Sequence, residues 1–184
     1  MPPATSLRAR LATRANALTL VRLALAPALA WALATGAAAL ALACFALAVG
    51  TDLADGPIAR RFGEVSALGG FLDHATDALF VASGLGALAS LGLVPPALPA
   101  LVVAAFAQYA LDSRALAGRP LRASALGRWN GVAYFVLLGI PVVRDGLALG
   151  WPADALVRAL GWLLVATTCV SMLDRLLALV RAPA

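Results

Sequence analysis

The sequence predicts an all-α membrane protein with six transmembrane helices. Of its 184 residues, 62% are hydrophobic and only 12% are charged, whereas a soluble domain is about half apolar and a quarter charged. The mean hydropathy is +0.92. The apolar residues also fall into long stretches, and about 20 apolar residues of helix suffice to cross a bilayer.

Short polar, glycine or proline segments separate these stretches and set the expected helix ends. The breaks lie at Gly36, 60–66, Pro95-Pro96, 118–128 and 144–152. The six expected spans are 17–35, 37–58, 67–92, 95–117, 127–147 and 153–180. We therefore expect residues 1–184 to form a single transmembrane domain, with a short cytosolic lead-in at 1–16.

The arginines predict the orientation of the chain. With a cytosolic N-terminus, twelve of the 14 basic residues fall on the inner side, and only Arg144 and Arg158 fall outside. Cytosolic loops of membrane proteins are enriched in arginine, so we expect both termini to be cytosolic, at a bacterial inner membrane. The same bias accounts for the pI of about 10.6. No nucleic-acid-binding motif accompanies it, and we expect no nucleic-acid partner.

Four aspartates lie inside the apolar stretches, in the patterns D-x-x-D-G-x-x-A-R and G-x-x-x-D-x-x-x-D. A carboxylate at bilayer depth costs about 2.5–3.5 kcal/mol and marks a functional site. Asp52 and Asp55 are three residues apart, and Asp73 and Asp77 are four apart, so each pair shares one helix face. An antiparallel hairpin of the second and third helices would bring all four together, about 13–19 Å from its tip, near the cytosolic interface.

The charge of this cluster predicts a metal site. Four carboxylates carry −4, which two divalent cations would balance, and all-oxygen ligands favour Mg²⁺ or Mn²⁺ over zinc. His74 points to a neighbouring face, and a supporting or packing role fits it better than ligation. Intramembrane acids also mark ion paths, so a divalent-cation or proton-coupled transporter is an alternative. Transporters spread their acids over several helices, whereas these cluster on one hairpin.

Small residues are interleaved with the aspartates. Gly56 and Gly69 allow a ligand or helix to approach the backbone closely, and Ala59 keeps one turn of the same face clear. Arg60 offers a planar fork suited to phosphate oxygens. Taken singly, each of these residues fits ordinary helix packing better than a binding site; the whole pattern is far more specific.

The segment DLADGPIARRFGEVSALGGFLDHATD, residues 52–77, resembles the signature of the CDP-alcohol phosphotransferases at every position. The stretch NALTLVRLALAP, residues 16–27, resembles the first helix of phosphatidylglycerophosphate-synthase-like members. The family transfers a substituted phosphate from a CDP-linked donor to an alcohol hydroxyl and releases CMP. The resemblance implies that Asp52, Asp55 and Asp73 ligate metal, and that Asp77 completes the second metal site and acts as general base.

The resemblance also implies the partners. Gly56, Ala59, Arg60 and Gly69 would shape the CDP pocket, with Arg60 on a phosphate. The expected donor is CDP-diacylglycerol in the membrane lipid, the acceptor a small alcohol, and a homodimer is a family-level expectation. Ala78 follows the last aspartate where many phosphatidylglycerophosphate synthases have lysine, while the Asp73-His74 pair is common in choline- and ethanolamine-type members. A CDP-choline- or CDP-ethanolamine-type activity therefore stays open.

Arginines near the predicted cytosolic mouth are candidates for acceptor binding or support. Arg22 lies within the first helix, where a charge should face the bundle or reach the interface; we expect it to face the bundle and support the site. The loop before the fifth helix contributes Arg114, Arg119, Arg122 and Arg128. They would bind a phosphate on the acceptor, such as glycerol 3-phosphate or an inositol phosphate, or anionic lipid headgroups. Arg128 is favoured for the site because it opens the fifth helix.

Overall fold

The structure, a computed structural model, describes residues 14–112 and 125–181. Within these ranges every regular element is an α-helix, and the predicted all-α fold is confirmed. The six helices, in chain order, are α2 (Arg14–Ala34), α3 (Ala38–Phe62), α4 (Ala67–Ser90), α5 (Ala97–Asp112), α6 (Ala125–Gly146) and α7 (Asp154–Arg181).

Two helix ends near the site differ from the expected spans. α2 begins at Arg14, three residues before the expected start, and this brings Asn16 into the helix. α3 continues to Phe62, past the expected end at 58, and stops at Gly63, whose φ of 67° is left-handed and favours glycine. α4 then begins behind Ser66, whose hydroxyl accepts a hydrogen bond from the Gly69 backbone N–H at 3.0 Å.

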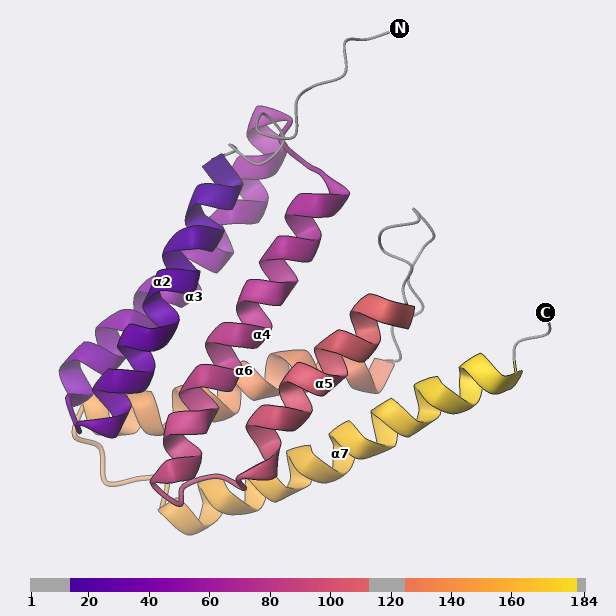
Figure 1. Cartoon of the computed structure of the whole chain (residues 1–184). Coiled ribbons are helices and arrows are strands. Elements are labelled where there is room, and N and C mark those ends of the chain that lie inside the picture. Colours follow the sequence, from indigo (N-terminus) through magenta and orange to yellow (C-terminus); the bar gives the residue numbers. More distant parts are fainter. Residues whose placement is uncertain (1–13, 113–124, 182–184) are drawn as a thin grey trace, which may run out of the picture.

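α2 is the central helix of the half that carries the aspartates. It packs along both α3 and α4, and these two make far fewer contacts with each other. Figure 1 shows α3 and α4 joined by a short turn at one end of the molecule, with α2 running beside both. α6 packs against α3 and α7, and α5 packs against α4 and α7. The two halves meet on a core that includes Leu29, Phe80, Leu85 and Leu138, each at most 1% exposed.

Glycines let α6 approach its neighbours closely. A Cβ atom added to Gly139 would lie 2.8 Å from the Phe45 ring of α3, and one added to Gly84 on α4 would lie 2.7 Å from Leu138. Real Cβ atoms essentially never approach so closely. These two positions therefore fix how near α6 sits to α3 and α4.

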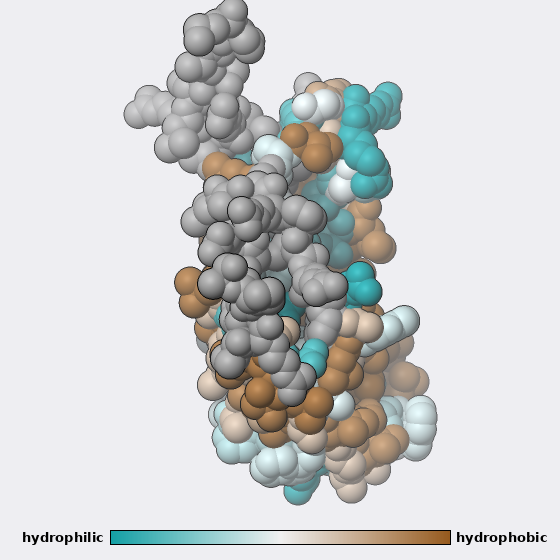
Figure 2. Space-filling model, turned by 90° about the vertical axis from the view of Figure 1, so that its right-hand side faces the viewer, coloured by the Kyte–Doolittle hydropathy of each residue, from teal (hydrophilic) through white to brown (hydrophobic). Residues whose placement is uncertain are grey.

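Four helices are long and apolar enough to cross a membrane: Asn16–Ala34, Ala38–Phe62, Ala125–Gly146 and Asp154–Ala178. α4 has 24 residues but carries the polar residues Asp73, His74 and Asp77, and the described part of α5 has 16. Many large apolar side chains face outward, as lipid-facing surfaces require. Figure 2 shows hydrophobic residues over the middle of the face in view, a mixture of hydrophobic and hydrophilic residues along its lower rim, and strongly hydrophilic residues gathered at the upper right.

Candidate active site

The four aspartates converge from α3 and α4 at one place in the bundle. Carboxylate oxygens of Asp52, Asp55 and Asp73 all lie within 4.8 Å of one another. Ligand atoms of Asp73, His74 and Asp77 form a second group within the same distance. The two groups share Asp73, so the acids form one continuous cluster, as their helical spacing predicted.

Arg22 of α2 lies at the centre of this cluster. Its side chain is fully buried, at 0% exposure, and contacts all four carboxylates. One terminal nitrogen, Nη2, lies 2.8 Å from Asp55 Oδ2 and 3.2 Å from Asp52 Oδ1. The other, Nη1, donates to Asp73 Oδ1 at 2.8 Å and to Asp77 Oδ1. The expectation that Arg22 faces the bundle therefore agrees with the structure.

The antiparallel hairpin expected from the sequence is present (Figure 1), and α2 packs along both of its helices. From there α2 supplies the guanidinium that the carboxylates of α3 and α4 share. The physical reason is charge, because two pairs of carboxylates brought together without a cation would repel one another. Asn16 and Thr19 precede Arg22 at intervals of three residues, and all three are buried; the sequence interpretation did not assign the first two to the site.

The small residues of the signature lie one helical turn from the aspartates, toward the α3–α4 turn. Gly56 follows Asp52 by four residues, and Gly69 precedes Asp73 by four. Beside Gly56, the Arg60 guanidinium lies 3.4 Å from where a Cβ would stand. At Gly69 a Cβ would lie 3.0 Å from the Ser66 hydroxyl and 3.4 Å from Asn16 Oδ1, which leaves little room for a side chain.

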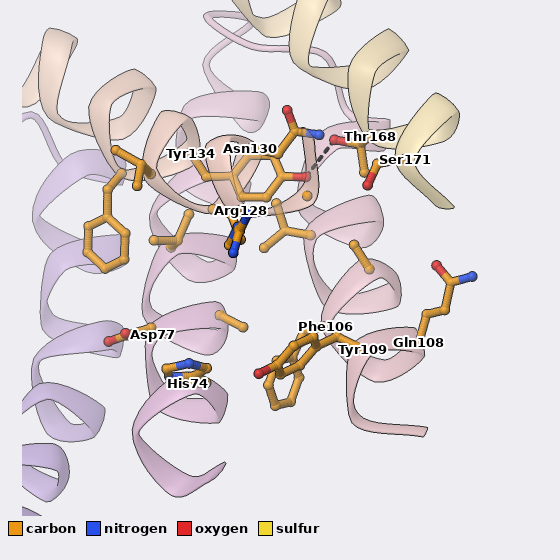
Figure 3. A pocket seen from close by; sticks show the side chains of 18 of the residues that line it. His74, Asp77, Phe106, Gln108, Tyr109, Arg128, Asn130, Tyr134, Thr168 and Ser171 are labelled. Atoms are coloured by element: carbon orange, nitrogen blue, oxygen red, sulfur yellow. Dashed lines mark hydrogen bonds between the residues drawn. The ribbon is translucent and has the colours of Figure 1, made fainter. Parts of the chain in front are cut away.

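A cavity of about 510 Å³ opens beside the cluster, between α4, α5, α6 and α7. Asp52 and Asp77 line it, whereas Asp55, Asp73 and the four small or basic residues expected for the CDP pocket are not among its described lining residues. Figure 3 shows the side chains that converge on this space from different helices. The polar and aromatic lining residues include His74, Phe106, Gln108, Tyr109, Arg128, Asn130, Tyr134, Thr168, Ser171 and Arg175.

Two arginines lie at this cavity. Arg128, which the sequence favoured, is one of them, and Arg175 of α7 is the other. The Arg175 guanidinium stands 5.3 Å from the centre of the Tyr109 ring, which fixes its position by a cation–π contact. In the sequence Arg175 counted only as one of the inner-side charges. Arg114, Arg119 and Arg122 lie outside the described residues.

The cavity also has a neutral polar wall that the sequence interpretation missed. Tyr134 and Thr168 share a hydrogen bond of 2.5 Å between their hydroxyls, drawn as a dashed line in Figure 3. Asn130 and Ser171 lie on the same two helices. The available signal was a few polar residues at helical spacing in otherwise apolar spans, but nothing in the sequence shows that α6 and α7 present them to one space.

The comparisons with known proteins bear on this arrangement. The family model described as CDP-alcohol phosphatidyltransferase matches residues 12–173. The chain belongs to this family. The resemblance of its signature is thereby confirmed, and the match covers all four aspartates, Arg22 and the cavity residues up to Met172.

Two curated relatives, each named probable phosphatidylglycerophosphate synthase and each from a strain of Mycobacterium tuberculosis, are 35% identical to this chain over 94 residues. The matched segment spans 48% of this chain and 45% of each relative, less than half of either protein. No solved structure matches the chain.

The donor atoms of the cluster suit the divalent cations typical of phosphoryl transfer. Carboxylate oxygens are the ligands preferred by Mg²⁺ and Mn²⁺. Two groups of donors that share Asp73 can hold two ions side by side. His74 belongs to the second group, with its Nδ1 3.6 Å from Asp73 Oδ2 and its ring 6.1 Å from that of Tyr109. Its supporting role stays a prediction.

Proposed function

We propose that this protein is an integral membrane phosphotransferase of phospholipid synthesis. It would transfer the phosphatidyl group of CDP-diacylglycerol to a hydroxyl of a small phosphorylated alcohol and release CMP. The observation that carries this proposal is the convergence of the family's four aspartates beside a cavity that also holds Arg128 and Arg175. Carboxylates for cations and guanidinium groups for phosphate are both required by the reaction, and here they adjoin one space.

Two Mg²⁺ or Mn²⁺ ions would be held by Asp52, Asp55 and Asp73 and by Asp73 and Asp77. Bound ions of this kind stabilise negative charge on a diphosphate as its leaving group departs. The protein's own contribution is to hold the carboxylates in place. Arg22 does so from α2, because its guanidinium donates to carboxylates on both α3 and α4.

Asp77 would take the proton of the attacking hydroxyl. Of the four aspartates, only Asp52 and Asp77 line the cavity, so an acceptor there can reach these two and not Asp55 or Asp73. Asp77 also lies on α4, beside the phosphate-binding candidates of α6 and α7. A carboxylate is a weak base for an alcohol in water, and positioning beside a metal-polarised hydroxyl is what would make it effective.

The donor's cytidine diphosphate would lie over the small residues one turn nearer the α3–α4 turn. Gly56, Ala59 and Gly69 leave this surface low, and Arg60 lies beside it with its guanidinium over Gly56. The distribution of arginines favours a cytosolic position for this end, where CDP-linked donors and soluble acceptors would meet. We further propose that both termini are cytosolic, that the chain is one transmembrane domain in a bacterial inner membrane, and that it pairs as a homodimer.

Glycerol 3-phosphate is the acceptor we favour. Arg128 and Arg175 offer two sites for a phosphate at the cavity, and the curated relatives carry the name of a phosphatidylglycerophosphate synthase. An inositol phosphate presents the same chemistry and is the second candidate. A choline-type acceptor carries a cation where a polyol phosphate carries its phosphate. Arg128 and Arg175 would repel this cation, so the cavity disfavours such an acceptor.

Incubation of the purified protein with CDP-diacylglycerol, Mn²⁺ or Mg²⁺ and single acceptors tests the proposal. We expect CMP release together with a new lipid whose mass is that of phosphatidic acid plus the acceptor minus one water. The Asp77→Asn variant, prepared in the same way, is the control for contaminating synthase. Absence of both products with every acceptor, combined with cation uptake by the protein in liposomes, would favour the transporter alternative.

A further inference from the structure

Asn130 carries an unpartnered donor inside the cavity. The side chain of Asn130 is 5% exposed, and its Nδ2 has no hydrogen-bond partner among the described residues. Buried polar atoms in native proteins nearly always have a partner, from the protein or from a bound molecule. Since Asn130 lines the cavity, the partner it lacks within the protein can come from a ligand there.

The neighbouring Tyr134 has an acceptor to offer. The Thr168 hydroxyl donates its one proton to the Leu164 carbonyl at 2.6 Å. The 2.5 Å contact between Thr168 and Tyr134 must therefore be donated by Tyr134. The phenolic oxygen of Tyr134 keeps its lone pairs, and Tyr134 lies one helical turn from Asn130 on the same face of α6. One donor and one acceptor thus stand side by side.

Gln108, another residue that lines the cavity, carries an unpartnered acceptor. Its Nε2 donates to the Met172 carbonyl at 3.0 Å, which fixes the amide, while its Oε1 has no partner among the described residues. A hydroxyl group both donates and accepts, so it matches this set of atoms. The described lining residues of α6 and α7 include no carboxylate that would pair with an ammonium group.

We propose that Asn130 and Tyr134 bind a hydroxyl of the acceptor that does not react, so that the protein selects polyol phosphates over alcohols with a single hydroxyl. This inference rests on the proposed function. In the proposed arrangement, Asp77 faces the reacting hydroxyl of the acceptor and an arginine holds the acceptor's phosphate. The neutral wall of α6 and α7 then recognises the rest of the acceptor. Asn130 is then a residue that determines acceptor specificity.

The test compares glycerol 3-phosphate with 3-hydroxypropyl phosphate, which lacks only the middle hydroxyl. The wild-type protein should prefer glycerol 3-phosphate by about tenfold or more in kcat/KM, the size of one well-placed hydrogen bond to a buried group. In Asn130→Leu this preference should fall to within about twofold, through a higher KM for glycerol 3-phosphate. The KM for CDP-diacylglycerol should not change.

The ratio between two acceptors is measured on one preparation, so a smaller folded fraction of the variant does not alter it. Thr167→Val is the matched control, since Thr167 is a polar residue of α7 outside the cavity lining and hydrogen-bonds to Leu164; it should keep the wild-type preference. Asn130→Asp keeps the shape but removes the donor, and it should lose the preference like Asn130→Leu.

Direct binding separates this inference from the proposed function. Titration of wild-type and Asn130→Leu proteins with both phosphates, followed calorimetrically, needs no turnover. Tighter binding of glycerol 3-phosphate that Asn130→Leu abolishes would support the subsite even if no lipid product formed, in which case the proposed reaction alone would fail. An undiminished preference in Asn130→Leu, in turnover or in binding, would overturn the inference.

Discussion

Replacing Arg22 with methionine should make the stability of the protein depend on divalent cations. Arg22 is fully buried and contacts all four carboxylates. Methionine keeps the helix propensity and an unbranched apolar stem, but leaves the four acids without their common cation. Removing one partner of a buried ion pair costs about 3–5 kcal/mol. For a chain of this size, that corresponds to a fall of about 6–20 °C in Tm.

Thermal unfolding in detergent, with EDTA or with Mn²⁺, measures this effect without any substrate. In EDTA we expect Arg22→Met to unfold well below the wild type, and saturating Mn²⁺ to restore most of the difference, because the ions supply the missing positive charge. Arg22→Lys keeps the charge but cannot reach several carboxylates as a planar fork does. Its Tm in EDTA should therefore lie between those of the wild type and Arg22→Met. Equal Tm values for Arg22→Met and wild type in EDTA would refute the view that Arg22 neutralises the cluster.

Three further outcomes follow from the site and the packing. Asp77→Asn should lower turnover on the order of 10²–10⁴-fold, the usual contribution of a positioned base, while binding of CDP-diacylglycerol, followed with a labelled donor, is retained; near-normal turnover would exclude Asp77 as base. EDTA should abolish CMP release, and added Mg²⁺ or Mn²⁺ should restore it; activity that survives chelation would contradict a metal-dependent reaction. Gly139→Leu should destabilise the fold by at least about 1–3 kcal/mol in thermal unfolding, because an added Cβ would already meet Phe45 at 2.8 Å. Gly50→Ala is the control: its added Cβ would have nothing within 4 Å, so this variant should be neutral or stabilising.

Local signals in the sequence were enough for the helices but not for their packing. Long apolar runs, Pro95-Pro96 and glycines at the breaks predicted six helices, and the described residues form six. The start of α2 at Arg14 was missed because the polar residues around Asn16 suggested a lead-in rather than a helix face. That face is buried because α2 lies between α3 and α4, a long-range arrangement that no spacing within one segment reveals.

The candidate site likewise has a part that the sequence predicted and a part that it did not. The aspartates were predictable because charge inside an apolar stretch is energetically costly and their spacings put each pair on one face. Asn130 and Tyr134 gave a much weaker signal, since isolated neutral polar residues are common in membrane helices and satisfy one another across helix contacts. Their significance depends on which atoms remain unpartnered after the helices pack, and only the three-dimensional structure contains that information.

The position of Arg22 also changes the electrostatics expected at the site. From the sequence, two divalent cations would neutralise the four aspartates. With the buried guanidinium of Arg22 included, the cluster carries −3, so two ions would leave the loaded site at +1. A net positive site attracts the diphosphate of a CDP-linked donor, and in a low-dielectric environment even one unit of charge has a large effect on an anion. Arg22 therefore holds the carboxylates together, and with two ions bound it would also give the site a charge complementary to that of a CDP-linked donor.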